Sequence, residues 1–408
     1  MKVAFREIEG RSRGYYGLLG ALGVFVATGL LAALYMEHYG HIVTGMNNHI
    51  VWGMPHVFAV FLIVAASGAL NVASIASVFG KAMYKPLAPL SGLLAIALLI
   101  GGLTVLMLDL GRPERLIVAM THYNFKSIFA LNIFLYTGFL AIVIVYLWTM
   151  MERRMHPYTK PAGVIAFVWR LLLTTGTGSI FGFLVARQAY DSALLAPMFI
   201  VMSFSYGLAI YVLVLMAACR GAGRPLGDDI LLRLKSLQAI FIAAVLYFVG
   251  VYHLTNLYFT KSHGVERFIL IDGGIHTQLF WIGQILLGNV LPLAILFHPR
   301  LGKSRRLIAL SAGMVVLGGL AQMYVTIIGG QAYPLDLFPD MQMSSSFYDG
   351  VVHGYKASLP EVALGLGGVA IAGVIVVLAI KLLRFLPKSL DGGVVAASDA
   401  GESLVKAG

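Results

Sequence analysis

The chain has 408 residues, of which 59% belong to the apolar set AVILMFWYC and only 12% are charged. Its mean hydropathy is +0.86. Soluble domains are roughly 45–50% apolar and about 25% charged, so this composition excludes a soluble globular protein and indicates a membrane protein. The net charge is +11, but the positions of the positive residues report membrane topology and do not indicate nucleic-acid binding.

Apolar stretches long enough to cross a bilayer, about 20 residues each, occur ten times. Their continuity and the 46 glycines favour helices over barrel strands, which would alternate in polarity over about ten residues. The sequence therefore predicts an all-α polytopic fold. Spans two to five and six to nine are candidates for two four-helix units, which periodicity alone does not establish. The spans are expected near residues 14–36, 52–79, 87–109, 127–150, 162–186, 193–219, 232–259, 274–297, 306–330 and 359–383.

Positive charges are unevenly divided between the two sides of these spans. Of the 29 Lys and Arg residues, 21 fall on the side of the N-terminus, 7 fall on the opposite side and Arg170 lies within a span. By the positive-inside rule, both termini are cytoplasmic, in a bacterial or archaeal cytoplasmic (inner) membrane. We expect a cytoplasmic leader at 1–13, the transmembrane domain at 14–385 and a disordered tail at 386–408.

The outer connections are longer than the inner ones, and nine of the eleven histidines lie in them or near outer helix ends. This distribution predicts that partner subunits dock on the outer face, with segments 110–126 and 331–358 as the docking surface. Aromatic and acidic residues mix in the longer of these segments, as they often do at interfaces. They are Tyr333, Asp336, Asp340, Phe347 and Tyr348.

A single cysteine, Cys219, restricts the redox cofactors that the chain can bind. An iron–sulfur cluster needs about four thiolates, and attached c-type haem needs a Cys-x-x-Cys-His motif. We therefore expect neither group, and no metal site, in this chain. Electrons would have to arrive from or leave to a partner.

The third span ends in Leu-Asp-Leu-Gly-Arg-Pro-Glu-Arg at 108–115. Glycine and proline here are typical of a helix end. Asp109 is harder to explain, because a carboxylate at a helix C-terminus meets the negative end of the helix dipole. We expect Asp109 to have a cationic partner, either Arg112 or a histidine. A structural cap and a functional site are both compatible with this motif.

Span two opens with Trp-Gly-Met-Pro-His at 52–56, and it contains a polar stripe. His56, Ser67, Asn71 and Ser74 are separated by nearly whole helical turns, so they share one face. Polar side chains facing lipid would be costly, so the stripe faces the bundle. It serves either as interhelical hydrogen bonding or as part of a hydrated path.

Arg170 lies about eight residues, roughly 12 Å, from the cytoplasmic end of span five. Thr174 and Thr177 share its face. An ionisable group at this depth is a functional candidate, although a buried packing role is the alternative. We predict a proton path built from Arg170, the two threonines and the stripe Ser67, Asn71 and Ser74.

Taken together, these residues resemble the polysulfide reductase/NrfD family of quinone-interacting membrane subunits. The run at 108–115 is the strongest point, and the opening of span two at 52–56 supports it. The resemblance extends to about residue 385. Within the family, the chain is most similar to the DsrP-type subunit of DsrMKJOP complexes of sulfur metabolism.

The resemblance implies two four-helix bundles with flanking helices and a quinone site near the outer face. The quinone would be menaquinone or ubiquinone. The partners would be a periplasmic iron–sulfur subunit, other membrane and cytochrome subunits of a DsrMKJOP-like complex, and lipid. Asp109, Arg112 and His56 match the motif positions, and His122 and Tyr123 are added by proximity.

These expectations describe a membrane subunit of an oxidoreductase complex that is not catalytic alone and has no nucleic-acid partner. Two alternatives remain. A di-histidine cytochrome b would need facing histidine pairs, and His56, His253 and His276 would supply only an outer haem. A secondary transporter would typically show broken helices at the midplane, where Arg170 is the one strong feature.

Overall fold

The computed structural model describes residues 4–335, 341 and 350–390. Within this part of the chain, ten helical segments are long and apolar enough to cross a membrane. Their ends lie close to the predicted ones, which confirms the all-α polytopic fold. The segments are Arg13–Tyr39, Met54–Ser77, Ala82–Leu108, Ile128–Met151, Arg153–Gly182, Leu195–Gly221, Asp228–Tyr258, Ile275–Phe297, Arg305–Ala332 and Leu359–Leu382.

The first five spans consist of α1, α2 with α3, η2 with α4, α6, and η4 with α7, and short connecting helices lie outside them. The bounds are α1 Arg13–Tyr39, η1 His41–Val43, α2 Met54–Ala69, α3 Asn71–Ser77, η2 Ala82–Leu87, α4 Ala88–Leu108, η3 Pro113–Arg115, α5 Leu116–Thr121, α6 Ile128–Met151, η4 Arg153–Tyr158 and α7 Thr159–Gly182.

The later spans are α8, α9, a segment formed by α11, η7 and α12, a segment formed by α13, η9 and α14, and α15. Three elements, η6, η7 and η9, are π-helical. The bounds are α8 Leu195–Gly221, α9 Asp228–Tyr258, η5 Thr260–Ser262, α10 His263–Arg267, η6 Phe268–Asp272, α11 Ile275–Gln278, η7 Leu279–Val290, α12 Leu291–Phe297, η8 Leu301–Lys303, α13 Arg305–Tyr324, η9 Val325–Gly329, α14 Gly330–Ala332 and α15 Leu359–Leu382.

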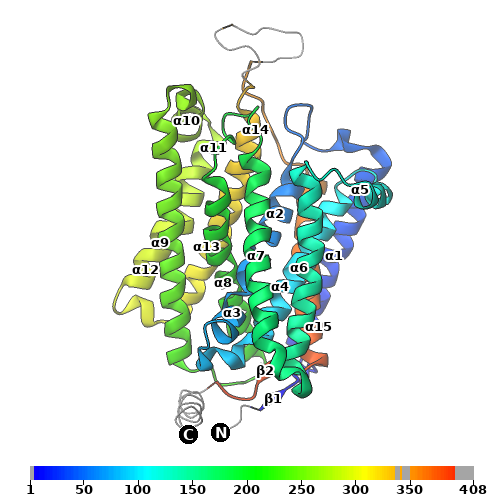
Figure 1. Ribbon diagram of the computed structural model, residues 1–408, viewed down its shortest axis with the longest axis vertical. Coiled ribbons are helices and arrows are strands. Elements are labelled where there is room, and N and C mark those ends of the chain that lie inside the picture. The colour runs from blue at the N-terminus through cyan, green and yellow to red at the C-terminus, as the bar shows by residue number, and fades with distance from the viewer. Residues whose placement is uncertain (1–3, 336–340, 342–349, 391–408) are drawn as a thin grey trace.

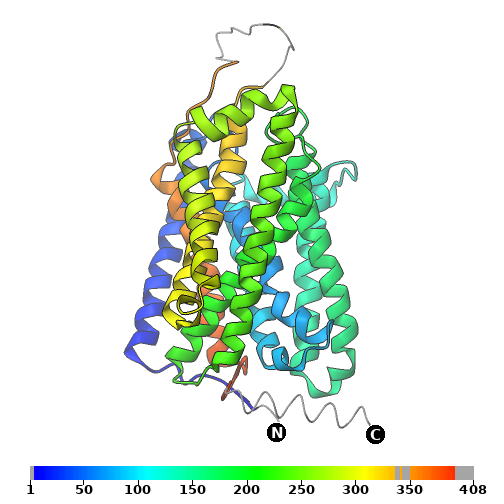
Figure 2. The ribbon, with the colours of Figure 1, turned by 90° about the vertical axis from the view of Figure 1, so that its left-hand side faces the viewer.

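The spans pack as two bundles that share a long interface. Helices α2, α4, α6 and α7 contact one another in the first bundle, and α8, α9, η7 and α13 do so in the second. Helix α8 packs against α2 and α7 and joins the bundles, whereas α1 and α15 pair with each other along the side of α2 and α4. Figures 1 and 2 show these helices running along the long axis of the molecule.

Small residues allow the two bundles to approach closely. A Cβ atom on Gly207 of α8 would lie 2.1 Å from the backbone of Gly68 in α2, and one on Gly68 would meet the carbonyl of Ser203. Gly29 of α1 faces Gly367 of α15 in the same way. Membrane helices associate through such close van der Waals packing. Moving an apolar side chain from lipid to another helix gives no hydrophobic gain that could hold the helices together.

Span two is interrupted at Leu70, between α2 and α3. The Ser91 hydroxyl of α4 donates to the Ala69 carbonyl at 2.6 Å and accepts from the Ala73 amide at 3.1 Å, so it replaces the direct Ala73-to-Ala69 bond. A side chain inserted into the helical ladder is an established cause of a kink. Beside the interruption, the Ser67 carbonyl accepts from the Leu70 amide at 3.3 Å and also from Arg170 at 3.1 Å.

The first and last described segments, β1 and β2, lie together at one end of the molecule, which we call the terminal face (Figure 1). Strand β1 Phe5–Arg6 pairs antiparallel with β2 Leu386–Pro387. The first residues of the predicted tail thus contact the folded chain, since Leu386 to Lys388 bond to the leader and Leu390 forms a bridge with Leu226. The remainder of the tail, 391–408, lies outside the described residues. The opposite end, where α2 begins and α4 ends, is the distal face.

Candidate functional site

A buried carboxylate closes α4 at the distal face. The helix ends at Leu108, and Asp109 is its C-cap, with its amide donating to the Val105 carbonyl at 3.1 Å. The Asp109 side chain is only 1% exposed. A charge placed there is opposed both by the loss of water and by the negative end of the helix dipole, so it needs nearby cations.

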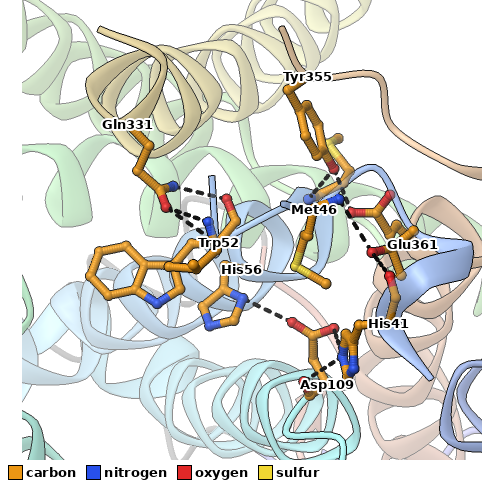
Figure 3. Close-up of polar contacts among 11 residues, drawn as sticks. His41, Met46, Trp52, His56, Asp109, Gln331, Tyr355 and Glu361 are labelled. Atoms are coloured by element: carbon orange, nitrogen blue, oxygen red, sulfur yellow. Dashed lines mark hydrogen bonds and ion pairs between the residues drawn. The ribbon is translucent and has the colours of Figure 1, made fainter. Parts of the chain in front are cut away.

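Two histidines direct ring nitrogens at Asp109 (Figure 3). The Nδ1 atom of His56 lies 2.9 Å from Oδ2 of Asp109, and Nε2 of His41 lies 3.6 Å from Oδ1. His41 Nε2 also contacts the Asp109 carbonyl oxygen at 3.1 Å. The expectation of a cationic partner is thus met by histidines.

Of the two partners expected for Asp109, Arg112 is the wrong one. Arg112 is exposed and forms no ion pair with Asp109 in the part of the chain that the structure describes. Gly111 adopts φ +68° and turns the chain away from the carboxylate. A Cβ atom on Gly111 would lie 2.9 Å from Cε1 of His41. Glycine is therefore required both for the turn and for the approach of the His41 ring.

The histidines and the carboxylate stabilise one another's charged forms. Burial alone would raise the pKa of Asp109, but the contacts and charges of His41 and His56 outweigh it and leave this pKa below its usual value. The Asp109 contact raises the pKa of His41, although partial burial opposes the change. Both shifts favour a charged carboxylate beside a protonated His41.

The first turn of α2 is fixed in place, and with it His56. Gly53 is the N-cap and Pro55 occupies the first turn, where a proline is tolerated. The Met54 amide donates to the Tyr355 hydroxyl at 2.7 Å. The Gln331 side-chain oxygen accepts from the amides of Val51 and Trp52, so groups from distant segments hold this helix end (Figure 3).

Glu361, in the first turn of α15, is fully buried and supports the same region. It accepts hydrogen bonds from the Tyr355 hydroxyl at 2.6 Å and from the amides of Gly45 and Ser358, each at 2.8 Å. The sequence analysis missed both Glu361 and His41. The Ser-x-x-Glu capping box at 358–361 was the readable signal for Glu361. For His41, the only signal in the sequence was that it belongs to the group of outer histidines.

Two other predicted site residues lie apart from this cluster. Exposed His122 contacts the Thr121 hydroxyl at 3.0 Å, and Tyr123 stacks on Phe125. Among the described residues, neither forms a hydrogen bond, ion pair or ring contact with His41, His56 or Asp109. Their part in ligand binding stays a prediction.

The Asp109 cluster has an open edge and unused polar atoms. His56 is 19% exposed and His41 34%, in contrast to the buried carboxylate between them. Both Asp109 oxygens and His56 Nδ1 lack a well-aligned hydrogen bond from a described residue, although they lie at ion-pair distance. The Trp52 ring stacks near His56 with centroids 6.1 Å apart. An aromatic ring with carbonyl oxygens fits this combination of a flat wall and N–H donors.

Arg170 is buried in α7 and binds groups of α2 at its interruption. Its Nη1 atom donates to the Ser67 carbonyl at 3.1 Å and to Asn71 Oδ1 at 2.6 Å. Phe167 and Phe204 place their ring faces about 5 Å from the guanidinium carbon. No carboxylate pairs with Arg170 in the described chain, and its Nε atom has no partner there.

Of the other residues of the predicted proton path, some contact Arg170 and some bond elsewhere. The Thr174 hydroxyl donates to the Arg170 carbonyl and the Ser67 hydroxyl to the same group, so both lie in the Arg170 cluster. Thr177 instead contacts the Tyr136 hydroxyl, and Ser74 donates to the Leu70 carbonyl. The structure thus brings four of the six residues together.

A second histidine–carboxylate pair lies at the distal end of the other bundle, and the sequence analysis missed its acid. Glu266, in the short helix α10, is buried and lies 2.7 Å from His253 Nδ1. Its other oxygen accepts from the Asn256 amide at 2.8 Å. His56 and His253, both considered as haem ligands, therefore each direct one ring nitrogen to a carboxylate.

Comparison with known proteins gives consistent results. Residues 42–334 match the family described as polysulphide reductase, NrfD. The sequence is 28% identical to the Hdr-like menaquinol oxidoreductase integral membrane subunit of Archaeoglobus fulgidus, over 95% of this protein and 98% of that one. It is 22% identical to the C subunit of the selenate reductase of Mesobacillus selenatarsenatis, over 90% and 94%. With the C component of the polysulfide reductase of Wolinella succinogenes, identity is 24% over 70% and 96%.

The pKa shift of His41 predicts how its contribution to stability depends on pH. Because this pKa is raised in the folded protein, the charged pair with Asp109 contributes fully below the ordinary histidine value and is lost as pH rises through the folded value. Thermal unfolding should show that His41→Gln lowers Tm more at about pH 5.5 than at about pH 9. His38→Gln, at the exposed end of α1, is the control. A His41→Gln effect that is the same at both pH values would contradict the charged pair.

Proposed function

We propose that this chain, which belongs to the polysulphide reductase/NrfD family, exchanges electrons between membrane quinone and an iron–sulfur partner subunit. The carrying observation is the buried Asp109 held between His41 and His56 at an open edge of the distal face. The name of the Archaeoglobus relative favours menaquinone over ubiquinone. A place in a DsrMKJOP-like complex of sulfur metabolism is part of this proposal.

A quinone undergoes two-electron, two-proton chemistry, and the protein must supply or accept the protons. Asp109 keeps its charge through the two histidines and in turn favours the protonated form of His41. Nδ1 of His56 is directed at the Asp109 carboxylate, so Nε2 donates a hydrogen bond to a ligand carbonyl when the ring holds both protons, and accepts one from a quinol hydroxyl when it holds a single proton. Trp52 provides the flat wall beside it. Arg112, His122 and Tyr123 stay candidates for contacts at the rim.

The distribution of Lys and Arg supports a distal face that points away from the cytoplasm. The single cysteine supports electron transfer through a partner, since the chain has too few thiolates for a cluster of its own. We place the partner on segments 110–126 and 331–358, beside the Asp109 cluster. Of the latter segment, residues 336–340 and 342–349, including Asp336, Asp340, Phe347 and Tyr348, lie outside the described residues.

The Arg170 cluster supports a proton route from the terminal face. A guanidinium without a carboxylate partner is costly at this depth, and its unpaired Nε favours a bound water. Asn71 accepts from the Arg170 guanidinium, and the Ser67 and Thr174 hydroxyls both donate to the Arg170 carbonyl. We propose that these residues form the inner half of a route toward the quinone site.

Removing the Asp109 charge should reduce quinone chemistry without loss of assembly. In the assembled complex, Asp109→Asn is expected to lower quinol-coupled electron transfer roughly tenfold or more, because the amide cannot stabilise a protonated imidazole. Glu37→Gln, an exposed acid near the distal end of α1 and outside the proposed docking segments, is the control and should retain full turnover. Normal turnover in a well-assembled Asp109→Asn complex would make the cluster structural.

Photo-crosslinking tests the docking face. A crosslinking amino acid at Glu114 or Asn124, both exposed on the distal face, should capture the iron–sulfur subunit. The same amino acid at Arg154 or His298, on the terminal face, should not capture it. Crosslinks formed only from the terminal face would place the partner on the opposite side.

Substitution of Arg170 separates a proton route from a packing role. Arg170→Met keeps much of the side-chain volume and deletes the charge, and we expect turnover and membrane-potential coupling in proteoliposomes to fall together. Arg170→Lys keeps a charge and should retain part of both activities. If Arg170→Met assembles with normal turnover and unchanged coupling, the residue serves packing alone.

A further inference from the structure

A cavity of about 1020 Å³ opens at the terminal face and extends upward between the bundles and the flanking pair α1 and α15. It reaches Phe58, in the second turn of α2, and so spans most of the height of the molecule. Its volume lies at the upper end of the roughly 300–1,000 Å³ typical of small-molecule sites. None of the Asp109, His56 and His41 cluster lines it.

The upper part of this cavity is a purely apolar shaft. Five helices besides α1 supply its walls, and no acid, amide, histidine or hydroxyl side chain lines it above the mouth. Such a shaft accommodates a hydrocarbon chain and offers no group to protonate a quinone ring. Its lining includes Leu62, Leu94, Leu98, Leu213, Val316 and Leu366.

The mouth, in contrast, is positively charged. Arg6, Arg11 and Lys388 line it, are exposed, and form no ion pair within the described residues. Of the two acids there, Glu7 is paired with Arg384 at 3.3 Å, which leaves Glu9 as the opposing charge. Three cations around an apolar shaft match the chemistry of an anionic amphiphile.

The mouth is also a built structure. The β1–β2 pair forms its floor, and its register places Arg6 and Lys388 on the same face of the strand pair. Arg224, which also lines the cavity, donates to the carbonyls of Leu386 and Glu7 and thereby ties both strands to the end of α8. The backbone positions of Arg6 and Lys388 are therefore fixed by strand pairing.

We propose that this cavity binds an anionic phospholipid of the leaflet that contacts the terminal face. An acyl chain occupies the shaft, and the headgroup phosphate lies among Arg6, Arg11 and Lys388. Basic residues at a membrane surface attract acidic lipids electrostatically, and guanidinium groups suit the oxygens of a phosphate. The lipid fills the space between the bundles and the α1–α15 pair, where the helices leave a gap.

Lipid retention by the purified complex tests this assignment. After exhaustive detergent washing and incubation with phosphatidylglycerol, native mass spectrometry should show one lipid bound to this subunit. The triple variant Arg6→Gln, Arg11→Gln, Lys388→Gln should retain at least roughly tenfold less phosphatidylglycerol than the native subunit. The control replaces Arg153, Arg154 and Lys160, three cations of the same face outside the cavity, and should retain lipid as the native complex does.

A second variant tests the shaft without touching the mouth. Ala217→Trp places an indole in the cavity lining and should also abolish retention while quinone turnover is kept. Equal retention of phosphatidylglycerol by native protein and triple variant would overturn the proposal. So would equal retention of phosphatidylcholine and phosphatidylglycerol, or copurification of quinone alone in the cavity.

Discussion

Burial of charge without water is the constraint on which this structure depends. In a bilayer, each buried polar group must be satisfied by the protein itself. Asp109 ends a transmembrane helix with a carboxylate that is almost fully buried, and it can remain charged only because His56 and His41 are held within ion-pair distance. Gly111 leaves room for one ring, and the hydrogen bonds that fix α2 position the other. The two histidines of the site thus stabilise the buried Asp109 carboxylate at the end of α4.

The same constraint explains the interior of the first bundle. Arg170 would be costly without polar partners, but the Ser67 carbonyl and the Asn71 side chain, on either side of the interruption of span two, accept its hydrogen bonds. The Ser91 hydroxyl bonds both backbone groups that the interruption would otherwise leave unpaired. The interruption of span two, Ser91 and Arg170 therefore form one cluster of hydrogen-bonded polar groups in the first bundle. A polar unit of this kind at mid-depth, without a counter-ion among the described residues, favours the entry of water and so supports the proposed proton route.

Sequence alone predicted the α-helical parts of the spans to within a few residues, because hydropathy over about 20 residues reports directly on the bilayer. It missed the 3₁₀ segments Ala82–Leu87 and Arg153–Tyr158 that precede α4 and α7. It also identified Asp109 and the seam between Arg170 and Asn71. It failed where a contact depended on backbone direction. Arg112, three residues from Asp109, was a natural partner until Gly111 turned the chain, and His41 reaches the site through a short 3₁₀ helix whose path no periodicity reveals. The pairing of leader and tail, and Glu266 beside His253, were likewise unpredictable, since they join segments without a local signal.

Photoaffinity labelling of the assembled complex with an azido-quinone tests the central claim most directly. The account predicts that excess natural quinone prevents labelling, and that the label falls on peptides containing His41, Trp52 to His56, or Asp109. Label confined to the second bundle, around His253 and His276, or to the apolar cavity at the terminal face would contradict the account, because the Asp109 cluster would then be only a structural charge pair.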